Sequence, residues 1–238
     1  MVTFDMFKSA LRLSTDSNVR DFLYHMTHID NLQSIFEKGL LSHNAARNIT
    51  KQDISLATVQ GRRNWLEPIY HRPIHDYVPL YFNASNPMLF CRKDMQESIC
   101  ILKISKDVMT KEGVLFTDGN AAVHTTSTYE HATTFYSDSK DLDKLNWDCI
   151  YDLYWNDYDD GKRIRCAEVL VPDQIETRYI RSIYVYPNTM NNSVLARKID
   201  FIHNKYNIET ITDNKYVYFF KTNQTNTKKE VNDEELPF

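Results

Sequence analysis

His25 and Thr27 are the first residues whose types and spacing point to chemistry. They lie in an aromatic and branched run, residues 23–27, that is typical of a β-strand. Side chains two positions apart on a strand share a face, and a helix is expected to begin directly afterwards, where an anionic group such as a pyrophosphate is favoured. The pair could therefore bind a flat polar ligand. The same pattern also fits an interior histidine with a satisfied hydrogen bond and a strand-filling threonine.

Glu168 is the second such residue, because it interrupts an apolar strand predicted over residues 165–171. A carboxylate in an apolar strand costs much free energy unless it is paired or faces a cleft. One interpretation is a salt bridge to Arg165 or to another arginine. The other is a functional carboxylate that holds a ligand hydroxyl and stabilises developing positive charge.

The elements that must position these side chains are short and mixed. We expect Asp30 to cap a helix that ends at Gly39. Pro79 places its strand at a sheet edge or a bulge. Further strands are predicted over residues 76–82, 98–104, 114–117 and 179–186, and helices over 52–63, 106–111, 131–136, 142–150 and 193–206. Strands and helices do not alternate regularly, which predicts an α+β fold rather than a doubly wound sheet.

Composition limits the classes of protein that remain. The chain has 238 residues, 42% of them hydrophobic and 25% charged, which suits one globular domain over residues 1–220 followed by a polar, disordered tail over 221–238. With only 5 glycines it contains neither GxGxxG nor GxxxxGK[ST]. No signal peptide and no run of about 18 apolar residues is present, so we expect no membrane association. A net charge of −4 means that a nucleic-acid partner would need a local basic patch.

The four cysteines indicate reduced thiols of a cytosolic protein. None forms a CxxC pair and none has zinc-ligand spacing with a histidine, so no metal site is expected. They are Cys91, Cys100, Cys149 and Cys166.

Several short motifs, in order along residues 23–220, resemble those of the DarT family, the DNA ADP-ribosyltransferase toxins of bacterial toxin–antitoxin pairs. Each motif alone is weak, but six in the same order are specific. They are His25-Met26-Thr27 with Asn31-Leu32, Gln60-Gly61-Arg62-Arg63, Asp76-Tyr77-Val78-Pro79 with Tyr81-Phe82, Asn86-Pro87-Met88-Leu89, Thr117-Asp118, and Ala167-Glu168 with Leu170-Val171.

This resemblance implies an ADP-ribosyltransferase fold, with a split and mostly antiparallel β core, flanking helices and a cleft for NAD+ as co-substrate. Arg63 and Glu168 match the catalytic arginine and glutamate of the family. The segment from about 43 to 62 matches the element that folds over NAD+. The residues that match its cofactor-binding positions, in addition to Arg63, are His25, Met26 (through its backbone), Thr27, Asn31, Ser34 and Ser42.

The resemblance also implies a single-stranded DNA substrate, whose bases are free of pairing and can stack on aromatic side chains. Related sequences often carry a histidine where this chain has Asn120, so an acid–base role is not expected there, although a role in positioning the base remains. The candidate nucleic-acid-binding residues are Arg47, Lys51, Asn120, Tyr154, Trp155, Tyr158, Lys162, Arg163 and Arg165, although core packing for the aromatics and solvated charges would give the same pattern.

The expected product is ADP-ribose attached to a ring nitrogen of a base, with nicotinamide released. The matching stretches are most similar to the thymidine-modifying branch of the family, so thymine is the expected base, with guanine or an RNA target as the leading variant. The alternative from another class of protein is a nucleotide-binding module without transferase activity. The resemblance further implies action in the bacterial cytoplasm and a partner, the antitoxin DarG, whose macrodomain removes ADP-ribose from the base.

Overall fold

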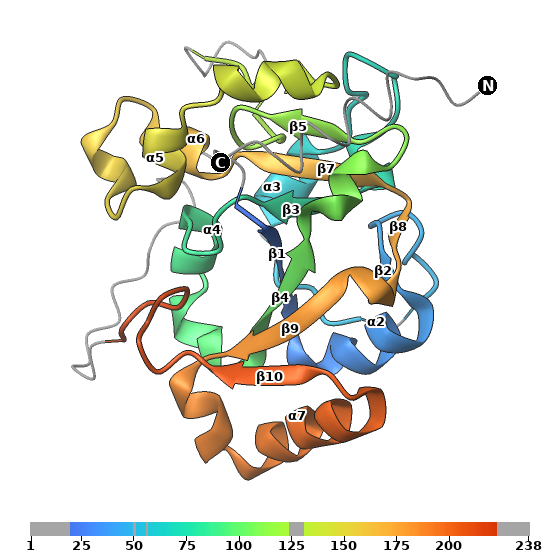
Figure 1. Ribbon diagram of the computed structural model, residues 1–238, viewed down its shortest axis with the longest axis vertical. Coiled ribbons are helices and arrows are strands. Elements are labelled where there is room, and N and C mark those ends of the chain that lie inside the picture. The colour runs from blue at the N-terminus through green and yellow to red at the C-terminus, as the bar shows by residue number, and fades with distance from the viewer. Residues whose placement is uncertain (1–19, 50, 56, 124–130, 223–238) are drawn as a thin grey trace.

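A computed structural model describes residues 20–49, 51–55, 57–123 and 131–222. Its centre is an eight-stranded sheet in the order β10-β9-β4-β1-β3-β7-β5-β6 (Figure 1). The strands are β1 Phe22–His28, β3 Tyr77–Tyr81, β4 Ile99–Ser105, β5 Leu115–Thr117, β6 Phe135–Tyr136, β7 Glu168–Pro172, β9 Ile180–Val185 and β10 Glu209–Thr212. Only the β9–β10 pair of this sheet is parallel. The predicted α+β class with a mostly antiparallel core is confirmed.

The sheet is split in its middle, between β1 and β3. Strand β1 pairs with β4 along its whole length, from Phe22 opposite Ser105 to His28 opposite Ile99. On its other side it pairs with β3 only where Tyr24 lies opposite Tyr81. The two halves therefore diverge beyond this point and leave a gap in the ladder for the side chains that follow on β1.

Both faces of the central strands are covered, which explains why β4 reads as an almost continuous apolar run. Cys100, Leu102 and Ile104 belong to the main core cluster, whereas Ile99 and Ile101 belong to a second cluster on the other face. All five are fully buried. The alternation of side chains along one strand thus joins two cores.

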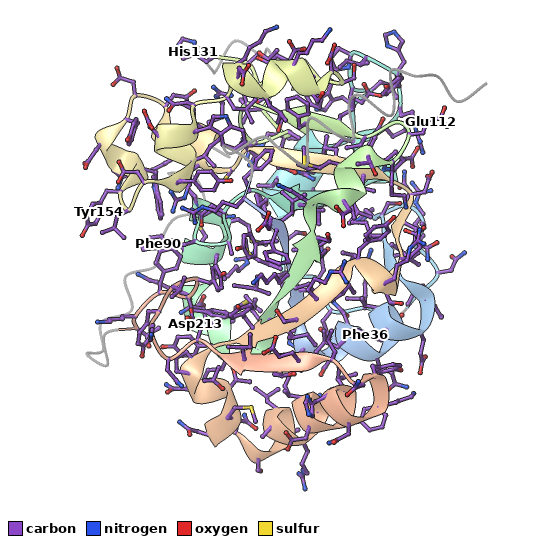
Figure 2. All side chains as sticks on the ribbon, in the orientation of Figure 1. Phe36, Phe90, Glu112, His131, Tyr154 and Asp213 are labelled. Atoms are coloured by element: carbon purple, nitrogen blue, oxygen red, sulfur yellow. The ribbon has the colours of Figure 1, made fainter. Side chains whose placement is uncertain are left out.

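Short helices surround the sheet. They are α2 Leu32–Lys38, α3 Ala57–Arg62, α4 Pro87–Phe90, α5 Trp147–Tyr151, α6 Gly161–Arg165 and α7 Ser193–Tyr206. Helix α7 lies beyond β10 at one end of the sheet, and α5 and α6 lie near the other (Figure 1). Phe36 of α2 (Figure 2) stacks on Tyr206 of α7 with ring centroids 4.9 Å apart, which fixes the two helices against each other.

The chain also forms a small second sheet and several 3₁₀ turns. The two-stranded sheet pairs β2 Leu40–Leu41 with β8 Gln174–Ile175. The 3₁₀ turns are η1 Ile29–Asn31, η2 Ile74–Asp76, η3 Lys93–Ser98, η4 Lys106–Thr110, η5 Ser139–Lys144, η6 Trp155–Asp157, η7 Thr177–Tyr179 and η8 Pro187–Asn191.

The strand–helix unit at the start of the described chain is confirmed, but its cap is not. A 3₁₀ turn intervenes between β1 and α2, and His28 caps this turn by accepting a hydrogen bond from the Asp30 N–H. Asp30 is therefore not the N-cap of the helix, and its carboxylate pairs with Lys198 of α7 instead. Gly39 ends α2 as predicted, with φ of 85°, a value that glycine adopts without steric cost.

Pro79 does not mark an edge strand, because β3 lies in the interior of the sheet. The N and C=O of one strand residue point to the same side, and the Pro79 carbonyl accepts a hydrogen bond from the His25 ring on β1. The side of Pro79 that lacks an N–H therefore faces the split, where no ladder partner is needed.

Other boundaries differ from prediction for local reasons. Residues 131–136 are not helical, because Phe135 and Tyr136 pair with β5. The helix predicted over 52–63 is limited to α3, and that over 106–111 is a 3₁₀ turn. Arg165 ends α6 rather than beginning β7. Helix α7 has the predicted bounds. Most of the expected tail, from residue 223 onward, lies outside the described residues. None of the helices within the described ranges combines the length and hydrophobicity of a membrane span.

Candidate active site

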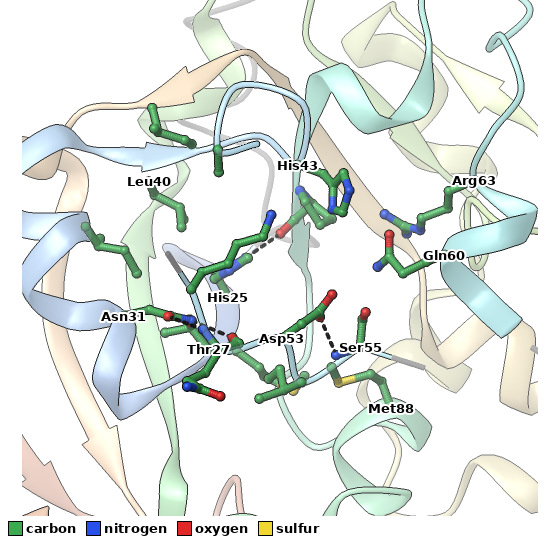
Figure 3. A pocket seen from close by; sticks show the side chains of 18 of the residues that line it. His25, Thr27, Asn31, Leu40, His43, Asp53, Ser55, Gln60, Arg63 and Met88 are labelled. Atoms are coloured by element: carbon green, nitrogen blue, oxygen red, sulfur yellow. Dashed lines mark hydrogen bonds between the residues drawn. The ribbon is translucent and has the colours of Figure 1, made fainter. Parts of the chain in front are cut away.

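A pocket of about 230 Å³ opens at the split of the sheet (Figure 3). Its floor comes from β1, through His25, Met26 and Thr27, and one wall comes from α3 and from Arg63, which directly follows this helix. Chain segments far apart in the sequence therefore meet here, as the sequence-based hypothesis requires. Among the predicted cofactor-binding residues, those that line the pocket are His25, Met26, Thr27, Asn31, Ser34 and Arg63. Ser42 does not line it; it is buried and accepts a hydrogen bond from the Ala45 N–H.

Arg63 and Glu168 form a buried ion pair beside this pocket. Nη2 of Arg63 lies 2.5 Å from both carboxylate oxygens of Glu168. The two side chains are 8% and 0% exposed. Burying both charges costs several kcal/mol per ion, and close pairing offsets this only when the remaining hydrogen-bonding capacity is also satisfied. The ion-pair interpretation of Glu168 is thus correct, with Arg63 as the partner and not Arg165.

The chain after β5 supplies the remaining support of Glu168. The Ala121 N–H donates to Glu168 Oε1 at 2.9 Å, and the Glu168 N–H donates to the Thr117 hydroxyl at 3.0 Å. Thr117 in turn donates to the Gly119 carbonyl at 2.7 Å. The loop that follows Thr117 is therefore folded around the carboxylate, which lies behind Arg63 and does not itself line the pocket.

The electrostatics of this group keep Arg63 charged. Burial lowers the pKa of the Arg63 guanidinium, but the Glu168 carboxylate and the Tyr81 phenol more than offset burial, so the pKa lies above its usual value. Tyr81 lines the pocket and lies opposite Glu168 on β3. Burial, and next the Glu168 charge, raise the pKa of Tyr81 well above its usual value, so its hydroxyl stays neutral. Arg63 is consequently a fixed cation and a very poor proton acceptor.

His25 presents a neutral imidazole to the pocket. Its Nδ1 lies 2.9 Å from the Pro79 carbonyl oxygen. A carbonyl can only accept, so Nδ1 carries the hydrogen and Nε2 keeps its lone pair. Burial lowers the pKa of His25, although the Pro79 hydrogen bond raises it in part. Both interpretations of His25 thus meet in one residue: it is a satisfied interior histidine, and its second nitrogen can accept a hydrogen bond from a ligand.

One side of the pocket is closed by residues 51–55, here called the strap. Asn31 fastens it through two hydrogen bonds to the Gln52 backbone: its amide donates to the carbonyl at 2.8 Å, and its Oδ1 accepts from the N–H at 2.8 Å. The same amide donates to the Thr27 hydroxyl at 3.0 Å. The strap residue Ile54 is 7% exposed and packs into the second core cluster. Asn31 therefore contributes to the pocket through the strap as well as directly.

A pair of neutral histidines lies beside Arg63. The rings of His43 and His75 stack with centroids 4.5 Å apart, and His75 Nε2 donates to Gln60 Oε1 at 2.9 Å. Burial is the main cause that lowers the pKa of His75 to about 4, and the electrostatic effects of the neighbouring His43 and Arg63 act in the same direction. This arrangement holds Gln60, whose side chain enters the pocket near Arg63 (Figure 3).

Two of the candidate nucleic-acid-binding arginines are occupied within the protein. Arg165 is 3% exposed and donates to three carbonyls, those of Ser85, Cys149 and Asp152. Arg163 pairs with Asp118 and Asp160. The structure therefore does not leave Arg165 or Arg163 free for a phosphate, and this part of the expected DNA-binding set needs correction.

The other candidates on this side are more accessible but lie among acids. Tyr154 is 63% exposed and points outward (Figure 2), whereas the Tyr158 hydroxyl donates to Asp152. Lys162 is exposed, and so are Asp157 and Asp159. Trp155 packs edge-on against Phe90 and Phe220. This aromatic surface can offer stacking faces, but its local charge does not attract phosphate.

The remaining candidates lie closer to the pocket. Asn120 and Lys51 line it, and Arg47 is exposed in the segment before the strap. The Asn120 side chain is held by the Ala122 N–H, which donates to its Oδ1 at 2.9 Å. Its NH₂ group is the part that remains for a ligand.

Sequence reasoning did not identify all the pocket residues. Those without an assigned role include His43, Gln60, Tyr81 and Met88. Gln60 lies one helical turn before Arg63, and Tyr81 lies two positions after Pro79 on the same face of β3, so helical and strand spacing were the available signals.

Comparison with known proteins gives one consistent result. Residues 24–219 match the family model described as "ssDNA thymidine ADP-ribosyltransferase, DarT". A DNA ADP-ribosyl transferase–DNA ADP-ribosyl glycohydrolase fusion protein of Thermosipho africanus is 33% identical over 212 residues, which cover 85% of this chain and 50% of that protein. The chain thus spans about half the length of this relative. A DNA ADP-ribosyl transferase of Thermus sp. is 33% identical over 186 residues, 73% of this chain and 85% of that protein.

Solved structures agree with these relatives. DarT of Thermus sp. 2.9 in complex with ADP-ribosylated ssDNA superposes with a TM-score of 0.69 at 26% identity, over 84% of this chain and 96% of that one. The same protein in complex with NAD+ gives a TM-score of 0.66 at 25% identity, over 84% and 98% of the two chains. The predicted ADP-ribosyltransferase fold is confirmed by these matches.

Proposed function

Because this chain belongs to the DarT family of single-stranded-DNA thymidine ADP-ribosyltransferases, we propose that Arg63 and Glu168 are its catalytic pair and that they transfer ADP-ribose from NAD+ to thymine in single-stranded DNA. The observation that supports this assignment is the buried ion pair at a pocket whose floor is the strand carrying His25 and Thr27. The first four matching segments contribute to its lining through residues such as His25, Gln60, Tyr81 and Met88, whereas Glu168 lies directly behind Arg63.

NAD+ would lie along the floor of the pocket, with its nicotinamide end at the split of the sheet. The backbone of Met26 and the Nε2 lone pair of His25 offer hydrogen bonds there. Lys51 in the strap and the exposed Arg47 supply positive charge for the pyrophosphate or for the DNA backbone. Ser34 and Asn31 line the side of the pocket next to α2.

The reaction would break the bond between ribose C1′ and the nicotinamide nitrogen. The electron pair of this bond leaves with nicotinamide, which becomes neutral, and positive charge develops on the ribose. Glu168 holds the 2′-hydroxyl and stabilises this charge, as carboxylates do in glycoside chemistry. A ring nitrogen of the base then bonds to C1′, and its proton passes to water. The raised pKa of Arg63 argues against proton transfer to this side chain, so its part is to orient the reactants.

The base would enter beside Asn120, whose NH₂ group can donate to a base carbonyl. Thymine has such carbonyl acceptors on both sides of its reactive ring nitrogen. Tyr154, Trp155 and Lys162 are the accessible residues from which flanking nucleotides could gain stacking and one positive charge.

The test is incubation of the full chain with NAD+ and matched single-stranded oligonucleotides that contain a single T, G or U, followed by mass spectrometry of the oligonucleotide and chromatography of nicotinamide. We expect an adduct on the T oligonucleotide and an equal amount of nicotinamide. An adduct confined to G or to RNA would overturn the choice of base, and nicotinamide release without any adduct would overturn the choice of acceptor.

A partner follows from the Thermosipho africanus relative, which joins a transferase to a DNA ADP-ribosyl glycohydrolase. We infer that this chain acts with a separate or fused glycohydrolase, the DarG antitoxin, in the bacterial cytoplasm where the DNA is. Removal of the adduct from the modified oligonucleotide by a purified DarG macrodomain is the expected result.

A further inference from the structure

Arg92 lies outside the pocket, yet its side chain holds one of the pocket walls. It follows α4 and precedes the 3₁₀ turn η3. Its Nε donates to the Ile54 carbonyl at 2.8 Å and its Nη2 donates to the Ser55 carbonyl at 2.9 Å. Within the described ranges no carboxylate forms an ion pair with Arg92, so these two strap carbonyls are the acceptors that its charge meets.

The backbone of Arg92 is anchored to a buried helix. The short helix α4 begins with Asn86, whose side chain accepts from the Leu89 N–H at 3.1 Å, and Leu89 is fully buried. The Arg92 N–H donates to the Leu89 carbonyl at 3.0 Å. On the same helix Met88 lines the pocket. The position of Arg92 is thus fixed relative to the pocket by the core.

The strap is consequently fastened at both ends across the pocket. Asn31 holds the backbone of Gln52 at one end, and Arg92 holds the carbonyls of Ile54 and Ser55 at the other. Helix α3 begins two residues after Ser55 and leads to Arg63. The strap therefore covers one side of the pocket and leads into α3, the helix that Arg63 directly follows.

We propose that Arg92 is a positioning residue of the transfer reaction, which fastens the strap over bound NAD+ without contacting it. This inference rests on the proposed function for its consequence in catalysis. The strap carries Lys51 and Asp53 toward the pocket, and loss of Arg92 would free two carbonyls and the part of the strap that follows Gln52. NAD+ binding should then require ordering of the strap, an entropic cost that the wild-type protein does not incur.

The matched variants are Arg92→Met and Lys93→Met. Both remove one positive charge from neighbouring positions, but Lys93 is exposed, with its ammonium over the Phe90 ring, and has no hydrogen bond to the strap. For Arg92→Met we expect the KM for NAD+ to rise about tenfold, since each of the two lost hydrogen bonds contributes a factor of about three. The kcat and the KM for the oligonucleotide should change less than about threefold. Arg92→Lys, which can restore one carbonyl bond, should lie between.

A second readout does not depend on activity. Trypsin cleaves after Lys51, within the strap, and we expect Arg92→Met to be cut there at least about tenfold faster than wild type and Lys93→Met. Saturating ADP-ribose should protect the wild type more than the variant. Equal cleavage rates together with an unchanged KM would overturn the proposal, and so would a fall in kcat alone.

The design separates this inference from the proposed function. If the wild-type chain forms no adduct on any oligonucleotide, the proposed reaction fails, while the cleavage rates still decide whether Arg92 fastens the strap. If Arg92→Met does not fold, Arg92→Lys gives the same comparison with a smaller expected change, and a cleavage rate equal to wild type for that variant would count against the proposal.

Discussion

Glu168→Gln tests the centre of the site with almost no change in shape. Glutamine keeps an oxygen that can accept from the Ala121 N–H, but it removes the negative charge next to Arg63. Loss of charge stabilisation at a developing cation costs about 100- to 1000-fold in rate when one such group is removed. We therefore expect adduct formation on a thymine oligonucleotide to fall at least about 100-fold.

The same variant should lose stability, because Arg63 is 8% exposed and would be left as an unpaired buried cation. Removing one partner of a buried pair costs about 3 to 5 kcal/mol, which corresponds to roughly 10 °C in melting temperature for a domain of this size. The double variant Arg63→Met with Glu168→Leu leaves no unpaired buried charge at this site and should melt close to wild type, yet remain inactive.

The assay is nicotinamide release and oligonucleotide mass, measured beside thermal unfolding by circular dichroism. The double variant is the control, since it separates loss of fold from loss of chemistry. The reasoning is refuted if Glu168→Gln works within tenfold of wild type, or if the double variant is as unstable as the single one.

Three further predictions concern residues around the site. Gly119→Ala places a Cβ 2.3 Å from the Arg163 guanidinium and 2.8 Å from the Cγ of Arg163, so the loop around Glu168 should shift and transfer should slow about tenfold or more. The control is Gly61→Ala, whose Cβ would have no atom within 4 Å; it should keep the wild-type rate and stabilise α3 by about 0.5 to 1 kcal/mol. Equal transfer rates for the two variants would contradict this prediction. The pKa of His75 is lowered from 6.5 to about 4, so the unfolded chain takes up the proton first and stability falls as the pH drops from 6.5 toward 4. The melting temperature of His75→Gln should therefore fall less over that range than that of the wild type, and an equal fall in the two proteins would count against the assignment. Arg165→Met leaves three carbonyls without their donor and should lower the free energy of unfolding in urea by about 3 kcal/mol, an expectation that a change below about 1 kcal/mol would exclude.

Local signals in the sequence were enough to predict several of the strands and helices and one of the two charged residues of the site. Aromatic and branched residue types predicted β1, the pattern over residues 193–206 predicted α7, and the isolated acid among apolar neighbours indicated Glu168. Hydrophobic periodicity identifies a face but not its partner, so the ion pair between residues 105 positions apart required the fold or the family resemblance.

The failures have a common physical cause, which is competition from distant groups. Asp30 has the right type for a cap, but Lys198 takes its carboxylate. Pro79 has the signature of an edge strand, but the split of the sheet makes its missing N–H harmless. Arg163 and Arg165 look like surface cations in the sequence, yet carboxylates and carbonyls from other segments occupy them.

The incomplete pairing of β1 with β3 affects which kind of ligand the protein can bind at this point of the sheet. Unpaired strand backbone normally invites addition of another strand, but here it lies at the bottom of a hollow, walled by α3 and roofed by the strap (Figure 3). The pocket has a volume of about 230 Å³, and a single planar carboxamide, with one donor and one acceptor, has the size and polarity of a peptide unit. The molecule thus keeps an opening in its own β-structure that a ligand's amide can complete in place of a neighbouring chain.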